Sequence, residues 1–316
     1  MFKIEELLVS SRQLIRSVSD RFIRYLYRDI LWDSRLVGIK GTRGTGKSTL
    51  VLQYLKLSDL KPDEKAYISL DDIYFLKHTL LDFGMKFYQS GGKLLVLDEI
   101  LKYPHWTRGI KNLNDRYPEL KIVFTGSSIK EISKMEGYLS RRAIIYELKG
   151  MSFREYLLFS VSLDLPILDL DLILHGDFHL GDIFPVDFKP LKYFKEFLQF
   201  GYYPFIVEGK KSYYQCIRQI VRTIVEYDMA EVKGFDIRQA RKLLQLLYII
   251  SQHVPFKPNL SSLAQKSDIH RNSINNYLYF LDQSRLISLL YHHIFSISSL
   301  QKPEKYIWKI PTCYLQ

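Results

Sequence analysis

The residues from Gly41 to Ser48 carry the strongest chemical signal in the chain, because they read Gly-Thr-Arg-Gly-Thr-Gly-Lys-Ser. This spacing matches G-x-x-x-x-G-K-[ST], in which glycines let successive backbone N–H groups turn toward a phosphate. Lys47 can reach the β- and γ-phosphates, and the Ser48 hydroxyl can bind magnesium. The pattern predicts a site for ATP or ADP with Mg²⁺. The residues expected to hold the nucleotide are Gly41, Thr42, Arg43, Gly44, Thr45, Gly46, Lys47, Ser48 and Thr49.

Two carboxylates, Asp98 and Glu99, follow the apolar run 94–97. After a phosphate-binding loop, such a pair is typical of the Walker B element. Asp98 is expected to hold magnesium, mostly through water, and Glu99 to polarise the attacking water. The alternative is an ordinary strand whose acids cap the next helix. For the acids at 71–72, which follow an earlier apolar run, capping is the favoured interpretation.

Two further groups of residues have candidate roles. Thr125 to Ser128 follow another apolar run, where small hydroxyl side chains either hold water or sense the γ-phosphate, or else cap a helix. Arg142 precedes a fifth predicted strand, beside Arg141. An arginine there can reach the γ-phosphate of a neighbouring subunit and stabilise transition-state charge. The alternative is a solvated arginine pair.

The elements that must position these residues alternate between strands and helices. Short apolar runs predict strands, and apolar residues recurring at steps of three and four predict helices. The predicted strands are 36–40, 66–70, 94–97, 120–124 and 143–148, and the predicted helices are 2–33, 48–56, 73–88 and 106–117. We expect an α/β fold with a parallel sheet flanked by helices.

The second half of the chain is predicted to be mainly helical. Helices are expected at 213–232 and 242–251, and 164–190 is expected to be a loop because it is rich in Asp, Gly and Pro. Next, 260–267 with a serine cap and 272–281 read as helix-turn-helix, followed by a strand and a hairpin wing. Such a winged helix either reads DNA or only packs and binds protein. If it binds DNA, the residues facing the groove are His270, Arg271, Asn272, Asn275 and Asn276.

Composition narrows the class of protein. The chain has 316 residues, 47% of them hydrophobic, so it can bury a sizeable core. It contains only two cysteines and neither a signal peptide pattern nor an apolar run of membrane-spanning length, which favours a cytoplasmic protein that does not enter a membrane. The net charge of +11 is spread along the chain, so it permits contact with nucleic acid without indicating it.

The order of these motifs resembles the prokaryotic AAA-family ATPases of the AAA+/STAND-like branch that carry a DUF4143 C-terminal region. The resemblance includes Met151 to Leu157 and Gly201 to Phe205, which is similar to the family's Gly-Gly-Phe/Tyr-Pro element. It implies an AAA+ P-loop NTPase core with sheet order 5-1-4-3-2, a helical lid and a winged helix. The family usually has Gly-Arg where this chain has Arg141-Arg142, which aligns Arg142 with the family arginine.

The predicted organisation has five parts. They are an N-terminal helical segment 1–33, the ATPase core 34–150, a helical lid 151–240, a winged helix 241–300 and a tail 301–316. We expect an ATPase that couples Mg²⁺-ATP binding and hydrolysis to movement of the winged helix, with catalytic Glu99, Lys47 and Arg142 and metal-binding Ser48 and Asp98. The alternatives are a nucleotide switch or scaffold with little turnover, and a DNA-binding regulator with a vestigial ATP site. The expected partners are ATP, a protein or DNA, and further copies of the chain.

The tail has a further peculiarity. Plausible codons for Lys305 to Gln316, read one frame away, encode a run that resembles the family sequence at this point. We therefore expect that a frameshift shortened a longer ancestor and removed a nuclease-like domain. Genomic DNA beyond Gln316 with no homologous coding in another frame would contradict this.

Overall fold

The computed structural model describes residues 4–127, 142–175, 180–228, 240–252, 259–291 and 303–308. The chain divides into two compact units, Met1–Lys149 and Gly150–Gln316. Arg141, Ser128 and residues 229–232 of the expected helix 213–232 lie outside the described residues.

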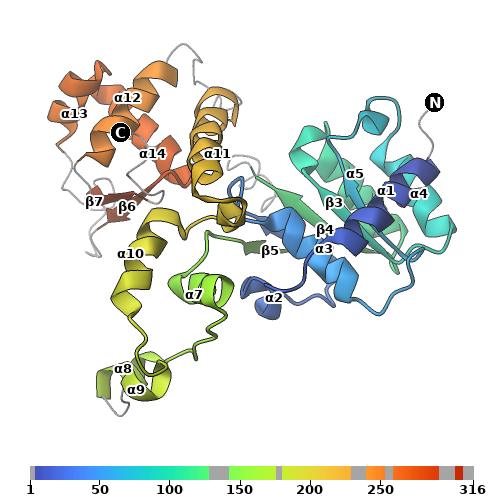
Figure 1. Cartoon of the computed structure of the whole chain (residues 1–316). Helices are drawn as coiled ribbons and strands as arrows, with labels where there is room; N and C mark the ends of the chain where they lie inside the picture. Colours follow the sequence, from blue (N-terminus) through green and yellow to red (C-terminus); the bar gives the residue numbers. More distant parts are fainter. Residues whose placement is uncertain are drawn as a thin grey trace. The chain divides into compact units, whose positions relative to one another are not determined.

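The first unit is built on a parallel sheet of five strands (Figure 1). The strands are β1 Leu36–Lys40, β2 Lys65–Ser69, β3 Leu94–Asp98, β4 Lys121–Gly126 and β5 Ile144–Glu147. Their order is β2-β3-β4-β1-β5, which confirms the expected order read from the opposite edge. β1 and β3 are buried almost throughout, as parallel strands covered on both faces must be.

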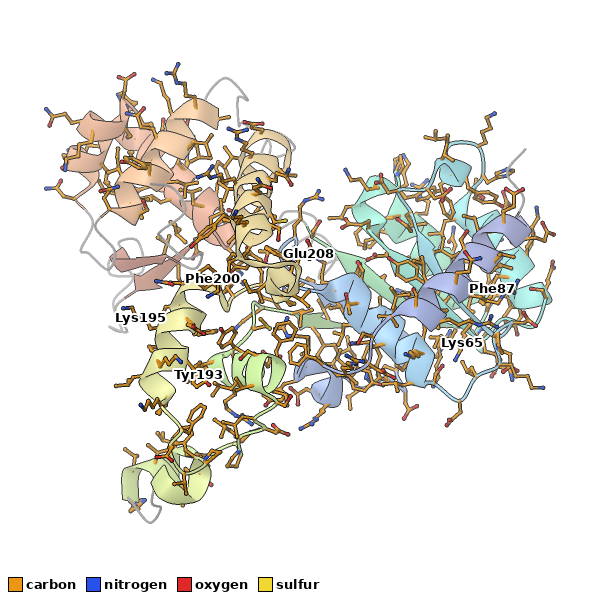
Figure 2. The ribbon with its side chains drawn as sticks, viewed as in Figure 1. Lys65, Phe87, Tyr193, Lys195, Phe200 and Glu208 are labelled. Carbon is orange, nitrogen blue, oxygen red and sulfur yellow. The ribbon has the colours of Figure 1, made fainter. Side chains whose placement is uncertain are left out.

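Helices cover both faces of this sheet and create two apolar cores. Successive residues of β3 alternate between them: Leu95 and Leu97 face one core, Leu94 and Val96 the other. Phe83 and Phe87 stack in the first core, where Phe87 is labelled in Figure 2. The helical elements of this unit are α1 Ile4–Ser17, α2 Leu26–Asp29, α3 Lys47–Leu57, η1 Ile73–Leu76, α4 Leu80–Gln89, η2 Ile100–Lys102 and α5 Trp106–Arg116.

Two predicted helices are shorter in the structure, and local caps explain one of them. The segment 2–33 is helical only over α1 and α2. The segment 73–88 splits into η1 and α4 because Thr79 caps α4, its Oγ1 accepting from the N–H of Asp82 at 3.1 Å. The capping expected for the acids at 71–72 is confirmed for Asp72, which accepts from the N–H of Tyr74 at 2.8 Å.

The described part of the second unit is mainly helical. The segment 164–190, expected to be a loop, contains the short helices α8 Leu170–His175 and α9 Leu180–Ile183. The helix expected from 213 begins at Lys210 and becomes a π-helix at η4 Ile224–Asp228. Its core includes Phe200, which Figure 2 labels, and Tyr213. The elements before residue 230 are α7 Phe153–Val161, α8 Leu170–His175, α9 Leu180–Ile183, α10 Pro190–Phe200, η3 Pro204–Glu208, α11 Lys210–Thr223 and η4 Ile224–Asp228.

The last described elements of the second unit are α12 Ala240–Ser251, α13 Leu260–Ser267, α14 Arg271–Gln283, β6 Ile287–Tyr291 and β7 Pro303–Trp308. The hairpin strands are antiparallel, and β7 lies within the segment expected as a tail. The cap of α13 is Asn259, whose Oδ1 accepts from the N–H of Ser262 at 3.1 Å, so the expected serine cap is wrong. Among the described helices, none is long and apolar enough to cross a membrane.

Candidate functional site

The loop between β1 and α3 has a backbone that only glycine adopts easily. Gly44 and Gly46 have φ of 81° and 91°, in the left-handed region, and Gly46 directly precedes α3. A Cβ at Gly41 would lie 2.3 Å from the carbonyl oxygen of Leu148. These three positions explain the glycines of the motif, and they place the N-terminus of α3 where an anion binds.

Lys47 is folded over this loop. Its ammonium donates to the carbonyl oxygen of Thr42 at 3.0 Å, and the Thr45 hydroxyl donates to the same oxygen at 2.8 Å. Lys47 is the first residue of α3 and is only 5% exposed. The positive charge therefore stays at the loop, in reach of phosphates bound there. Beside it, Arg43 is half-buried and Thr49 is exposed.

Asp98 is the centre of a cluster of hydroxyl groups. The Ser48 hydroxyl donates to Asp98 Oδ2 at 2.6 Å. The Tyr67 hydroxyl also donates to Oδ2, and the Thr125 hydroxyl donates to Oδ1. Asp98 is 3% exposed, so these donors replace the water that its carboxylate loses on burial. The structure thus brings together Ser48 and Asp98, the two residues expected to bind metal.

Glu99 has an unusual backbone. Its φ is 51°, a left-handed conformation that costs a residue with a Cβ about 1–2 kcal/mol. Its N–H faces Thr125 Oγ1 at 3.4 Å, and its Oε2 faces the Ser127 hydroxyl at 3.4 Å, both long for hydrogen bonds. The 125–127 segment therefore contacts both acids, with Thr125 on Asp98 and Ser127 on Glu99.

Arg142 lies away from the phosphate loop of its own unit. It precedes β5, whereas the loop follows the carboxyl end of the parallel neighbour β1. Its guanidinium pairs with Asp115, Nε to Oδ1 at 3.0 Å and a second nitrogen to Oδ2 at 3.3 Å. The structure does not bring Arg142 together with the other expected catalytic residues.

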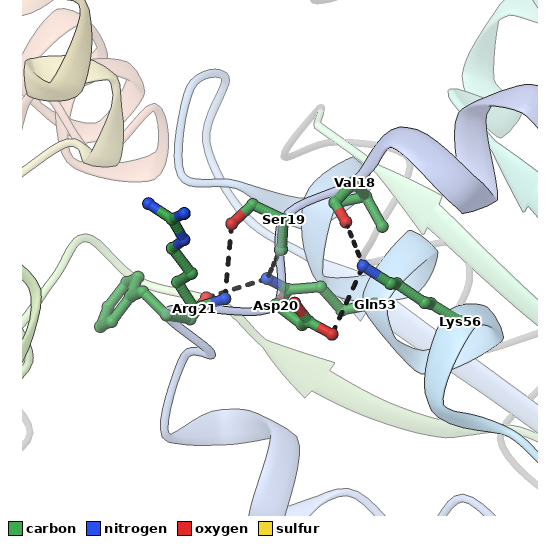
Figure 3. A network of polar contacts seen from close by, with 7 residues as sticks. Val18, Ser19, Asp20, Arg21, Gln53 and Lys56 are labelled. Atoms are coloured by element: carbon green, nitrogen blue, oxygen red, sulfur yellow. Dashed lines mark hydrogen bonds and ion pairs between the residues drawn. The ribbon is translucent and has the colours of Figure 1, made fainter.

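The segment 18–24 was not assigned to the site from the sequence. Hydrogen bonds connect it to the phosphate loop and to α3. Gln53 donates to the carbonyl oxygens of Ser19 at 2.7 Å and Phe22 at 2.8 Å, and Lys56 donates to that of Val18 (Figure 3). Lys56 also pairs with Asp20 at 3.4 Å.

Arg24 adds two further hydrogen bonds from the segment 18–24 to the first unit. It is 5% exposed and donates to the carbonyl oxygens of Thr45 at 2.7 Å and Lys149 at 2.8 Å. Its partners are backbone oxygens distant in sequence, so no side-chain pattern could have revealed them.

Tyr67 is the second residue that the motifs did not reveal. Burial, and then the nearby Asp98 carboxylate, raise the pKa of the Tyr67 hydroxyl, so the phenol keeps its proton at neutral pH and donates it. For this contact the sequence offers one signal: Tyr67 is an aromatic residue in the predicted strand 66–70, which precedes the strand that ends in Asp98 and Glu99.

These residues fit a magnesium–nucleotide complex. Magnesium prefers oxygen ligands and is usually held by one or two carboxylates together with substrate phosphates. Ser48 and Asp98 supply a hydroxyl and a carboxylate that already lie 2.6 Å apart. The left-handed glycines Gly44 and Gly46 let the loop backbone curl so that its N–H groups can turn toward a phosphate. Within the described residues, no group of three or more His, Cys, Asp or Glu forms an all-protein metal cage.

Comparison with known families agrees with this geometry. Residues 33–157 match the AAA domain family. The matched segment contains the phosphate loop, both acids and the five described strands of the parallel sheet. Residues 191–307 match a domain of unknown function, DUF8612, so the expected DUF4143 region is not confirmed.

Individual similar proteins are distant. Uncharacterized protein MJ1637 of Methanocaldococcus jannaschii is 26% identical over 302 residues, which cover 91% of this chain and 63% of that protein. The chain thus spans less than two thirds of the length of this relative.

Among solved structures, AMPPCP-bound DnaA from Aquifex aeolicus has 15% identity and a TM-score of 0.33, covering 86% of this chain and 87% of DnaA. The S. cerevisiae Hsp104–ADP complex has 14% identity and a TM-score of 0.32, covering 90% of this chain and 38% of Hsp104. TM-scores of this size do not by themselves establish a common fold.

Proposed function

We propose that the AAA domain binds Mg²⁺-ATP at residues 41–49 and hydrolyses it to ADP and phosphate. The observation that carries this proposal is the contact of Ser48 Oγ with Asp98 Oδ2 at 2.6 Å, which joins α3 to β3 beside the phosphate loop. Both oxygens are ligands that magnesium prefers. Bound magnesium would neutralise charge on the β- and γ-phosphates.

The chain's own residues divide the remaining work. The backbone N–H groups of the loop and the Lys47 ammonium bind the phosphates, and Asp98 orients the ion or its waters. Glu99 accepts a proton from the attacking water or orients it. The Ser127 hydroxyl faces Glu99 Oε2 at 3.4 Å, a long contact that the attacking water can replace.

Arg142 is proposed to act from a neighbouring subunit. It lies at the edge of the sheet opposite the phosphate loop, so it cannot serve its own site, and its exposed position leaves it accessible to another copy. The pair with Asp115 would then be exchanged for the γ-phosphate of that copy. This proposal requires a homo-oligomer.

The second unit is proposed to receive the conformational change. The helical region 151–240 would act as a lid, and α12, α13, α14 and the β6–β7 hairpin have the order of a winged helix. Its partner is a protein or DNA. DNA has one specific observation in its favour: the five residues expected to face a groove, at 270–272 and 275–276, are all exposed.

The deciding experiment combines ATP turnover, nucleotide affinity and mass in solution. We expect Glu99→Gln to retain nucleotide binding and to lower turnover at least about 100-fold, as loss of a general base does. Lys47→Ala should lose binding. Glu119→Gln and Lys111→Ala change exposed residues of the same unit and serve as matched controls.

The outcomes separate the candidate functions. Tight nucleotide binding without turnover in any oligomeric state would favour a switch or scaffold over an ATPase. DNA binding that depends on salt and persists in Lys47→Ala would favour a DNA-binding regulator.

A further inference from the structure

Tyr67 makes hydrogen bonds through both its backbone N–H and its side-chain hydroxyl. Its backbone N–H donates to the Ser11 hydroxyl at 2.7 Å, and Ser11 is a buried residue of α1, 2% exposed. β2 is an edge strand, so this hydrogen bond occupies an N–H group that has no partner strand. The other end of Tyr67 is its hydroxyl, on Asp98.

The sheet register explains how the phenol reaches the acid. Tyr67 is paired with Val96, and Asp98 lies two residues further along β3 on the same face. Such diagonal neighbours are separated by a distance that an aromatic side chain spans. A shorter side chain at position 67 would not reach Asp98.

The hydroxyl groups around Asp98 occupy most of the acceptor positions of its carboxylate. An ionised carboxylate has about four lone-pair positions. Ser48 and Tyr67 donate to Oδ2 and Thr125 donates to Oδ1, so three positions are used. Among the described residues no further side-chain donor reaches Oδ1, so its remaining position can accept from a metal-bound water. The Ser48 hydroxyl can bind the ion through its oxygen while it still donates to Asp98.

From this arrangement we propose that Tyr67 is a positioning residue, which fixes the Asp98 carboxylate in the orientation that magnesium requires. This inference rests on the proposed nucleotide site and adds a specific residue to it. Partners that orient a metal ligand in this way commonly contribute 10- to 100-fold to metal affinity, as an order of magnitude. A purely structural tyrosine would instead affect stability without changing the response to magnesium.

The test compares ADP affinity of the full chain with magnesium and with EDTA. In Tyr67→Phe we expect the ratio of these affinities to fall by about 10-fold, while the affinity in EDTA stays at the wild-type value. Tyr88→Phe is the matched control, because it removes a hydroxyl from α4, which packs in the core on the other face of the sheet from α3, and it should keep the wild-type ratio. Ser11→Ala, which frees the backbone of Tyr67, should lower the ratio in the same direction.

Each outcome of the ADP titrations either supports or overturns the role proposed for Tyr67. A wild-type ratio or a higher one in Tyr67→Phe would overturn the inference, the higher one by showing that the phenol competes with the ion. If Tyr67→Phe does not fold, Ser11→Ala decides by the same criterion. A wild-type chain that binds no ADP would overturn the proposed function and the inference with it. A wild-type chain with a magnesium response, unchanged in the variants, overturns the inference alone.

Discussion

At the scale of single residues, Glu99 combines a candidate catalytic role with a strained backbone. We expect Glu99→Gly to abolish ATP turnover and, at the same time, to raise the free energy of unfolding by about 1 kcal/mol, because glycine adopts φ of 51° without strain. Thermal unfolding and phosphate release measure the two effects. His105→Gly, also at positive φ and exposed, should increase stability and leave turnover unchanged. Lower stability in Glu99→Gly would contradict the assigned strain.

Gly41 allows a second prediction at this scale. In Gly41→Ala the new methyl would meet the carbonyl oxygen of Leu148 at 2.3 Å, so the backbone of the loop must move. We expect nucleotide affinity to fall at least about 10-fold, since phosphate binding depends on the directions of the loop N–H groups. Titration of ADP measures this. Gly181→Ala has open space and is the control; equal affinity in the two variants would argue against the loop as the phosphate site.

Tyr54 gives a prediction on pH. Burial, and then the charges of Asp33 and Tyr27, raise the pKa of Tyr54 to about 12 from 10.0. Its contribution to stability is complete below pH 10, and it is lost as pH rises toward 12, because the unfolded chain releases the proton first. We therefore expect Tyr54→Phe to lose less stability than the wild type between these pH values. Urea unfolding at each pH tests the difference, and parallel curves would contradict it.

At the scale of elements, the segment 18–24 connects the phosphate loop to the end of the first compact unit. Arg24 donates to Thr45 in the loop and to Lys149, the last residue of that unit. We expect Arg24→Ala to reduce the free energy of unfolding by about 1–3 kcal/mol, since it leaves a buried carbonyl oxygen without this donor, and to weaken ADP binding. Arg21→Ala removes an exposed arginine from the same segment as a control. Equal stability and affinity in the two variants would show that the segment does not support the loop.

At the scale of the whole molecule, the position of Arg142 predicts dependence on a second copy. We expect Arg142→Ala and Glu99→Gln to be inactive separately and to regain turnover when mixed. In a mixed oligomer, an intact Glu99 site can lie beside an intact Arg142. Phosphate release at increasing total protein concentration measures this, with each variant alone as its control. No recovery in mixtures that form oligomers would exclude a role for Arg142 in trans.

Much of the first unit was predictable because its signals are local. Short apolar runs marked all five strands, and glycines with lysine and serine marked the loop, since backbone conformation there restricts residue type. The sheet order came from the family resemblance, and the structure confirms it. Helix ends were harder to predict. Thr79 begins α4 inside the predicted helix 73–88 through a side-chain hydrogen bond, which the apolar pattern does not include.

The sequence by itself determined the chemistry available to this protein: a phosphate loop, two acids after a strand, and hydroxyl residues after the next strand. Only the tertiary structure decided which of these groups meet. Tyr67 and Thr125 reach Asp98 because β2, β3 and β4 are neighbouring parallel strands, and Ser48 reaches it from the start of α3. Arg24 reaches the loop from a distant segment. Contacts of this kind depend on strand order and on backbone oxygens that every residue has, so residue type alone cannot specify them.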